Sequence, residues 1–356
     1  MKKIITLSML FVATALFAQE EPEAPKFTLS GSVDAYYRAN FTAPNDENAI
    51  APGSSFANLP GFALGMANVV ASYEGEKVGF VADLVFGPRG TDAIFNSPMY
   101  GTPYVNADGG VSFAGTGNII NQLYAYWNVS ESVKLTLGNF NTFLGYEVIS
   151  PVANFNYSTS YLFSYGPFSH TGLKADFTLS EDFSLMLGVM NNTDFTEYNA
   201  TGDYAFGAQL GYSGQFLNVL VDPTFTEFDF TGGFDVSDSF FLGINAAYLV
   251  YDAPSDPSFY GVALYPQVGL SDTFTLGLRA EYFSETDFGA GAIGGYDANG
   301  DGSVIAATLT GSFAIDNLTI KPEIRLDSAS DDAFIDNDLA PTKSLGSFVL
   351  AAIYSF

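Results

Sequence analysis

Cysteine is absent from the 356-residue sequence, and histidine occurs only once. These absences exclude a disulfide framework, thiol chemistry and the common His/Cys metal sites. Basic residues are also scarce, with 12 Lys and Arg against 39 Asp and Glu, which gives a net charge of −27. Nucleic acids are therefore not expected as partners, because they need a basic surface.

Long apolar runs are missing after the N-terminal stretch. Every later segment is interrupted by Gly, Pro or a charge before it reaches the roughly 20 apolar residues of a membrane-spanning helix. The N-terminal stretch has two lysines, a short apolar run and then Ala18-Gln19-Glu20, the order of a secretory signal peptide. A membrane anchor is the weaker alternative, because the run is too short. We predict a signal peptide at 1–18, a short periplasmic segment at 19–26 and a β-barrel at 27–356.

Aromatic residues and glycine are abundant, at 16% aromatic and 36 Gly, without low-complexity tracts. Apolar and polar residues alternate with period two from Phe27 to Phe356, in segments of about 9 to 12 residues, the length of a tilted strand that crosses a bilayer. Short, mostly acidic turns alternate with longer loops, as periplasmic turns alternate with extracellular loops. The pattern predicts an all-β, antiparallel up-and-down transmembrane barrel of about 16 strands.

The segment 317–327 carries the clearest argument for a polar interior. Leu318, Ile320, Ile324 and their neighbours share one face, and charged residues share the other. A Lys or Arg that faces lipid costs roughly 2 to 4 kcal/mol at the midplane, so this face is expected to line a wet lumen. A soluble β-sandwich is the alternative, but it would need no export signal. The charges that alternation places inside are Asp34, Arg38, Asp83, Lys134, Lys174, Asp176, Glu227, Asp229, Asp235, Arg279, Glu281, Lys321, Glu323, Arg325 and Asp327.

These inward charges are of mixed sign, and the surplus of acid falls in loops and turns. Acidic vestibules concentrate cations, so we expect a mild cation preference. The facing charges have a second interpretation, in which they pair across the lumen and stiffen the wall. The last strand alternates up to Phe356, which resembles the ending of outer-membrane barrels and implies recognition by the barrel-assembly machinery.

The stretch 138–172 resembles a known family. It contains Gly138-Asn139-Phe140-Asn141-Thr142, Gly145-Tyr146-Glu147, Asn154, Tyr157-Ser158, Tyr161, Phe163 and Pro167-Phe168-Ser169-His170-Thr171-Gly172. This set is similar to the signature of OmpL-like porins, the β-barrel porin-2 family common in Bacteroidetes. Family members often continue with Asn-Gly-Trp-Asp, where this chain has Asn191-Asn192-Thr193-Asp194. The resemblance implies a porin in the outer membrane of a Gram-negative bacterium, in contact with its lipids.

The loop 144–168 within that stretch is rich in Tyr, Phe, Asn and Ser. We expect it to fold inward and narrow the pore, as third loops of large porins do. Tyr146, Glu147 and His170 are the constriction candidates, with Glu147 favouring cations. The alternative is that these three side chains only hold the loop against the wall.

A second candidate site is the turn Asp297-Ala298-Asn299-Gly300-Asp301-Gly302-Ser303. Oxygen ligands at alternate positions followed by Gly at the sixth match the first half of a calcium loop. The twelfth position is Thr308 instead of Glu, which excludes a complete EF-hand. A weak Ca²⁺ site at Asp297, Asn299 and Asp301, completed by another loop, and a plain hydrophilic turn both remain open. No other cofactor is expected.

No set of nucleophile, base and orienting group emerges, so we do not expect an enzyme. The leading hypothesis is a porin for passive diffusion of small hydrophilic solutes or ions. The alternative is a structural or binding barrel in an outer-membrane complex, with loops filling its lumen. A homo-oligomer is expected only by analogy of fold.

Overall fold

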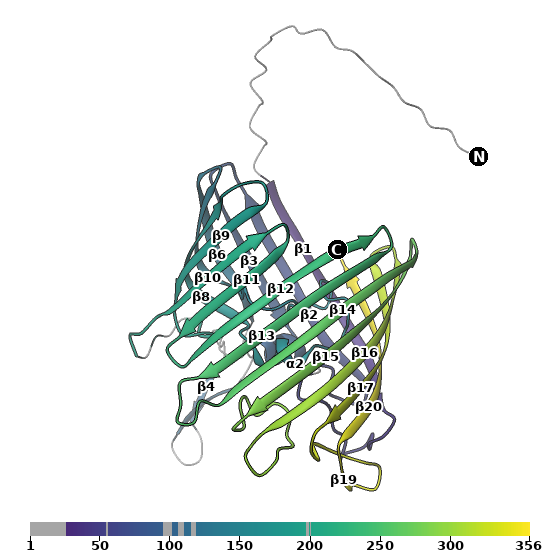
Figure 1. The fold of residues 1–356 in the computed structure, drawn as a ribbon. Helices are drawn as coiled ribbons and strands as arrows, with labels where there is room; N and C mark the ends of the chain where they lie inside the picture. The colour runs from purple at the N-terminus through teal and green to yellow at the C-terminus, as the bar shows by residue number, and fades with distance from the viewer. Residues whose placement is uncertain are drawn as a thin grey trace, which may run out of the picture.

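The computed structural model describes residues 26–54, 56–94, 102–105, 110–114, 119–196, 199 and 201–356. The predicted signal peptide lies outside these residues. Sixteen antiparallel strands form a closed barrel in sequence order, as Figure 1 shows. The predicted strand count and up-and-down topology are therefore confirmed.

The barrel strands are 8 to 15 residues long. They are β1 (Lys26–Asn40), β2 (Gly61–Glu74), β3 (Val78–Phe86), β6 (Ile120–Ser130), β7 (Val133–Asn141), β8 (Ser169–Thr178), β9 (Phe183–Met190), β10 (Ala205–Tyr212), β11 (Gln215–Asp222), β12 (Phe225–Ser237), β13 (Phe240–Tyr251), β14 (Ser258–Ser271), β15 (Phe274–Thr286), β16 (Gly302–Ile315), β17 (Leu318–Ala329) and β20 (Ser344–Ser355). The long connections add two hairpins and two short helices: β4 (Thr102–Val105) with β5 (Val111–Ala114), β18 (Phe334–Ile335) with β19 (Pro341–Thr342), α1 (Pro88–Ala93) and α2 (Tyr161–Tyr165). No helix in the described residues is long and apolar enough to cross a membrane.

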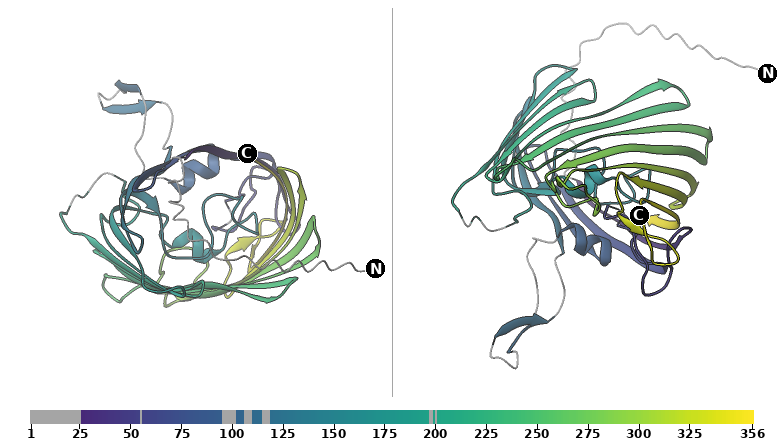
Figure 2. Two further views of the ribbon diagram at one scale, coloured as in Figure 1. Left: turned by 90° about the horizontal axis from the view of Figure 1, so that it is seen from above. Right: turned by 60° about the horizontal axis from the view of Figure 1, so that its bottom comes forward.

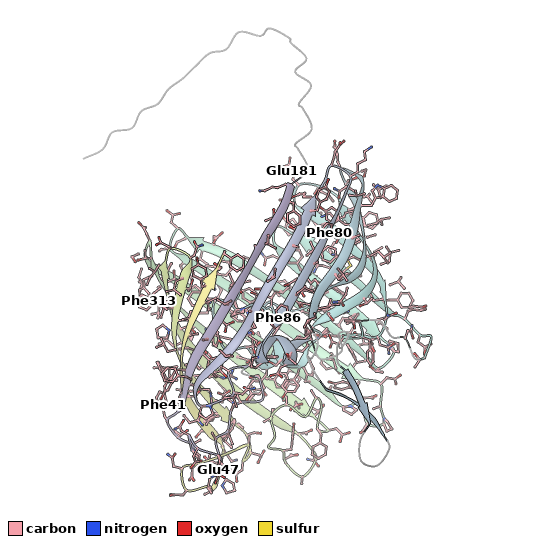
Figure 3. The ribbon with its side chains drawn as sticks, turned by 180° about the vertical axis from the view of Figure 1, so that it is seen from behind. Phe41, Glu47, Phe80, Phe86, Glu181 and Phe313 are labelled. Atoms are coloured by element: carbon pink, nitrogen blue, oxygen red, sulfur yellow. The ribbon has the colours of Figure 1, made fainter. Side chains whose placement is uncertain are left out.

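The barrel closes where β20 pairs with both β17 and β1. Gly31 and Phe356 complete this pairing with two backbone hydrogen bonds of 3.1 and 3.0 Å. Because neighbouring strands are antiparallel, β1 begins and β20 ends at the same rim, which also carries the short turns. The longer connections lie at the opposite rim. Figure 3 shows Glu181 in a turn at the first rim and Glu47 in a connection at the second.

The outward face of the wall is apolar, as the alternation predicts. Phe80, Phe86 and Phe313 are partly exposed on it and point away from the barrel in Figure 3. On β17, Ile324 and Leu326 are 45% and 56% exposed. An exposed apolar belt around a closed barrel is the surface that a lipid environment requires.

The interior differs from the uniformly polar lumen that the sequence predicts. Near the loop rim, inward-facing Leu249, Phe259, Phe283 and Val304 are at most 2% exposed. They form a hydrophobic cluster with residues of α2 and of the connections between strands. The polar expectation fails here because the connecting segments fold into the barrel and supply apolar partners for these side chains.

Candidate pore and the segment inside it

The connection between β7 and β8, residues 142–168, turns into the barrel, and we call it the inner segment. Figure 2, seen along the barrel, shows α1 and α2 inside the ring of strands. α2 is short and is preceded by Ser160, whose side chain accepts a 3.0 Å hydrogen bond from the Phe163 N–H. This N-cap satisfies one of the amides that the first turn of a helix leaves free. Because α2 lies inside the ring of strands, the predicted inward fold of loop 144–168 is present.

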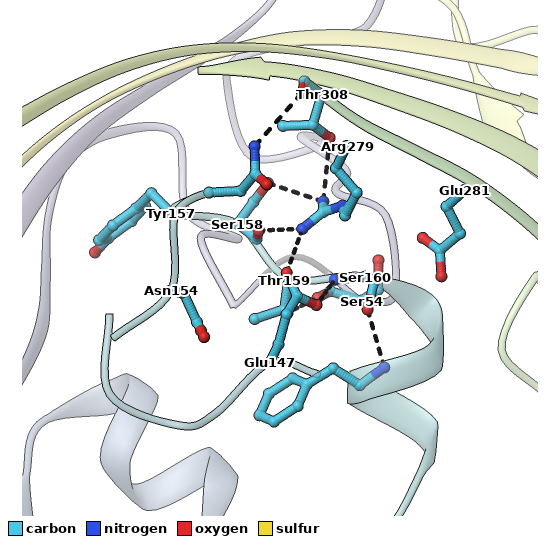
Figure 4. Close-up of polar contacts among 12 residues, drawn as sticks. Ser54, Glu147, Asn154, Tyr157, Ser158, Thr159, Ser160, Arg279, Glu281 and Thr308 are labelled. Carbon is cyan, nitrogen blue, oxygen red and sulfur yellow. Dashed lines mark hydrogen bonds and ion pairs between the residues drawn. The ribbon is translucent and has the colours of Figure 1, made fainter. Parts of the chain in front are cut away.

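Glu147 and Arg279 form the central ion pair between the inner segment and the wall. Their charged groups are 2.8 Å apart, and both side chains are at most 3% exposed. Glu147 also accepts the Ser160 N–H at 2.7 Å. The Arg279 guanidinium donates to the Ser158 carbonyl and, at 3.1 Å, to the Thr308 hydroxyl, as Figure 4 shows. The Glu147 carboxylate is therefore neutralised and enclosed.

Two wall carboxylates bind backbone amides of the inner segment. Glu281 accepts the N–H groups of Tyr161 and Leu162 at 3.0 and 2.9 Å. Glu323 accepts those of Tyr157 and Ser158 at 2.9 and 3.2 Å. Both carboxylates are at most 2% exposed. They satisfy amides that no strand or helix partner reaches, which a buried backbone requires.

The basic residues of β17 bind carbonyl groups of the same segment. Lys321 donates to the Pro151 and Asn154 carbonyls, and Arg325 donates to Thr159 at 2.8 Å while pairing with Asp327 at 2.8 Å. Lys321, Glu323, Arg325 and Asp327 are 1–4% exposed. The expectation that they line a wet lumen is wrong, because the inner segment occupies the space before them. It supplies partners for Lys321, Glu323 and Arg325, while Asp327 pairs with Arg325.

Glycines of the wall make room for aromatic rings of the inner segment. A Cβ added at Gly243 would lie 2.5 Å from the Tyr146 hydroxyl, and one at Gly277 would lie 2.3 Å from the Phe155 ring. Real Cβ atoms do not approach other atoms so closely, so each glycine is a socket for one ring.

Tyr157 of the inner segment contacts two strands of the wall. Its hydroxyl donates to Asp34 of β1, while its N–H binds Glu323 of β17. One residue thus contacts both strands that flank β20.

The two other constriction candidates lie in different surroundings. His170 is fully buried, with Nε2 at 3.0 Å from the Thr142 hydroxyl and its ring 5.2 Å from that of Phe143. Tyr146 stacks on Tyr265 at 4.2 Å and lines a cavity of about 490 Å³ beneath the inner segment. This geometry favours the alternative in which Tyr146, Glu147 and His170 hold the segment against the wall.

The remaining inward charges fall into two groups. Buried ones are hydrogen-bonded or enclosed at 1–8% exposure: Asp34, Arg38, Asp83, Glu227 and Asp229. Lys134 and Asp235 are exposed, and the side chains of Lys174 and Asp176 are 24% and 37% exposed. Lys134, Lys174 and Asp176 line a second cavity, of about 580 Å³, against β2, β3, β6, β7 and β8. Apart from Asp235 of β12, the accessible members of this set of inward charges thus lie on β7 and β8.

Asp194 lies in the connection after β9, outside the strands. Its carboxylate accepts the Phe168 and Ser169 N–H groups at 2.8 Å each, so it holds the end of the inner segment. Desolvation raises the pKa of Asp194 to about 7, against the lowering effect of these two hydrogen bonds. The sequence analysis named Asp194 only as the last residue of the segment 191–194, which departs from the family pattern at Asn192 and Thr193.

The proposed calcium turn forms a compact hydrogen-bonded loop. Asp297 accepts the N–H groups of Asn299 and Asp301 at 2.7 and 3.0 Å, and Asp301 accepts the Asp287 N–H at 3.2 Å. Within the described part of the chain, no three acidic or histidine side chains are placed to hold a metal. The weak Ca²⁺ site stays a prediction.

The sequence analysis did not single out two residues that anchor the segment. Arg89 of α1 is 2% exposed and donates to the Ile149 and Tyr157 carbonyls at 2.9 Å each. Ser54 accepts from Arg325 at 2.7 Å, and its carbonyl accepts from Ser164 at 2.8 Å. Arg89 lies in a short helix and Ser54 in a loop, both in connections between barrel strands, where alternation gives no signal. The available signal was that Arg89 is the single basic residue in the sequence between Lys77 and Lys134.

A closed 16-stranded barrel with an apolar outer belt and an inward-folded connection after β7 has the architecture of an outer-membrane porin. Comparison with known families supports this assignment to the outer-membrane porins. Residues 26–356 match the family described as "Putative beta-barrel porin-2, OmpL-like". The chain belongs to this family, and it is an outer-membrane β-barrel porin.

Solved structures show the same fold at low sequence identity. OmpT of Vibrio cholerae in a trimer form has a TM-score of 0.57 at 11% identity, covering 94% of this chain and 100% of that one. The channel DcaP of Acinetobacter baumannii has a TM-score of 0.58 at 14% identity, covering 93% and 97%. An anion-selective porin from Comamonas acidovorans has a TM-score of 0.57 at 9% identity, covering 94% and 100%. No match was found among curated proteins.

Proposed function

We propose that this porin passes small hydrophilic solutes and ions by passive diffusion along one side of its lumen. The supporting observation is the unequal use of inward charges. Those of β15 and β17 are enclosed by the inner segment, whereas Lys134, Lys174 and Asp176 line a cavity of about 580 Å³. Water and solutes need accessible polar groups, so we place the route along β2, β3, β6, β7 and β8.

We further propose a mild preference for cations. With 39 acidic against 12 basic residues, and with acids such as Glu181 and Glu47 at the two rims, both entrances have a negative potential. Such vestibules raise the local concentration of cations. Reversal potentials in a salt gradient test this preference.

Recognition by the barrel-assembly machinery through Phe356 and assembly into homo-oligomers stay predictions. The exposed Phe356 side chain, 54% accessible, supports the first. The second draws support only from the trimer form of the structurally similar OmpT.

A structural or binding barrel is the second candidate. The observation that favours it is the amount of apolar packing inside the barrel: clusters around α2, around α1, and beside β1 and β20 join the connections to the wall. In this case no solute would pass.

Swelling of proteoliposomes in sugars of graded size separates the two candidates. A porin gives swelling that declines as the sugar grows, and a structural barrel gives none. Ser72→Trp, in the proposed route, should slow the swelling. Ser312→Trp, a matched substitution in the cavity beneath the inner segment, should leave it unchanged. Equal rates for both variants would contradict the route.

A further inference from the structure

We propose that the cavity beside Lys134 and Lys174 is a binding subsite for small sugars that carry a carboxylate. This inference rests on the proposed function, because it places a binding site along the proposed route. The acidic rims set the proposed cation preference, whereas the two lysines act on a solute inside the lumen. It concerns the inward face of β6, β7 and β8, where the register pairs Lys134 with Asp176 and Thr136 with Lys174. The two lysines therefore lie on adjacent strands and face the same space.

Lys134 and Lys174 are accessible to a solute, unlike most other bases of the described residues. Five bases of the chain are enclosed at 0–4% exposure, mostly against backbone carbonyls: Arg38, Arg89, Arg279, Lys321 and Arg325. Lys134 is exposed, and no carboxylate of the described residues has an oxygen within 4.0 Å of its Nζ. Its ammonium group instead lies 5.3 Å from the Tyr126 ring centroid. A solute carboxylate would supply the missing counter-charge.

Lys174, Asp176 and Glu74 are the other charged residues of the lining, and Lys174 is the second cation of the subsite. Its Nζ lies 5.3 Å from the Phe140 ring centroid and 3.4 Å from the Asp176 carboxylate. Both partners of that ion pair are partly exposed, so the pair is weak. A solute anion can compete with Asp176 for the ammonium group.

The neutral lining argues for a sugar instead of a bare anion. Hydroxyl and amide groups come from Ser72, Gln122, Thr136 and Asn141, and ring surface comes from Tyr124. Sugar hydroxyls bind such groups, and the C–H face of a pyranose packs on aromatic rings. The volume of about 580 Å³ falls within the 300–1,000 Å³ typical of small-molecule sites. Glucuronate combines the required carboxylate, hydroxyls and ring.

Uptake into proteoliposomes tests the subsite. Initial rates are measured for labelled glucuronate, glucose and glucosamine with the wild type and with Lys134→Gln/Lys174→Gln. We expect the glucuronate-to-glucose ratio to fall several-fold in the double variant and the glucosamine ratio to rise. Asp176→Asn should raise the glucuronate ratio, because it removes the competing carboxylate. Lys343→Gln, between β19 and β20 at the opposite rim, is the control and should change nothing. An unchanged glucuronate ratio in the double variant would overturn the inference.

Calorimetry on the folded protein separates this inference from the proposed function. If glucose does not enter the liposomes, the diffusion function fails, and binding alone decides the subsite. Glucuronate binding that the wild type shows and the double variant lacks supports the subsite. Absence of binding to the wild type, or equally strong binding of acetate, overturns it.

Discussion

Glu147 and Arg279 lie 132 residues apart in the sequence and 2.8 Å apart in the barrel. Their ion pair joins the inner segment to the wall. Both side chains are withdrawn from water, so each depends on the other for neutralisation. A buried charge that loses its partner is costly, whereas replacing both charges by apolar residues of similar size is often tolerated.

Glu147→Ala should therefore destabilise the barrel by about 3 to 5 kcal/mol. The free energy of unfolding in urea, followed by circular dichroism in lipid vesicles, measures this loss. The paired variant Glu147→Leu/Arg279→Met is the control and should recover most of the stability. Wild-type stability of Glu147→Ala would contradict the pair as an anchor.

Glu147→Gln should leave the ion selectivity of the channel unchanged. The reason is that the carboxylate is enclosed and paired, so it does not present a free charge to passing ions. The reversal potential of single channels in a salt gradient is the measurement. A clear shift toward anion preference would restore Glu147 as a selectivity residue at a constriction.

Ile324→Arg should cost about 2 to 4 kcal/mol, the penalty of a cation on the lipid face near the midplane. Ile324 is 45% exposed on the outward side of β17. Ser312→Arg, inside the barrel beside a cavity of about 490 Å³, should cost far less. Both values come from urea unfolding in vesicles, and equal penalties would show that the assignment of faces is wrong.

Gly277→Leu should destabilise the protein by about 1 to 3 kcal/mol, as overpacking of a filled site does. The added side chain would occupy the place of the Phe155 ring. Gly269→Leu is a matched control, because the nearest atom to an added Cβ there is 3.9 Å away. The socket role would be excluded if both variants unfolded at the same urea concentration.

The stability of the protein should depend on Asp194 between pH 4 and pH 7. Its folded pKa of about 7 exceeds the ordinary value of 3.8, so the folded state binds the extra proton in this window. Stability from this group is then present at low pH and is lost as the pH rises through about 7. Unfolding free energies at about pH 5.5 and pH 8 should differ less in Asp194→Asn than in the wild type. The exposed Asp203→Asn should keep the wild-type difference.

The wall of this barrel could be predicted from the sequence because strand pairing between neighbours follows local alternation. Residues 317–327 show both the strength and the limit of that reasoning. Their inward and outward faces were assigned correctly, since a two-residue period fixes them. The partners of the inward face were not assigned correctly. Both water and the backbone of an inward-folded loop can form hydrogen bonds with charged side chains, and alternation does not distinguish between them.

The partners of Glu281, Glu323 and Lys321 are backbone amides and carbonyls of a distant loop. The alternation of side chains in the sequence does not indicate such backbone partners. The sequence shows that glycine and aromatic residues are abundant, but it does not indicate that Gly243 and Gly277 make room for rings. The pairing of each glycine with its ring needed the three-dimensional structure.

Tyr157 contacts β1 through its hydroxyl and β17 through its backbone amide, and β20 lies between these strands. The first strand and the penultimate wall strand are therefore tied together from within. The tie spans the position of β20 from inside the barrel, so the spacing of β1 and β17 at the closing seam does not depend on β20 alone.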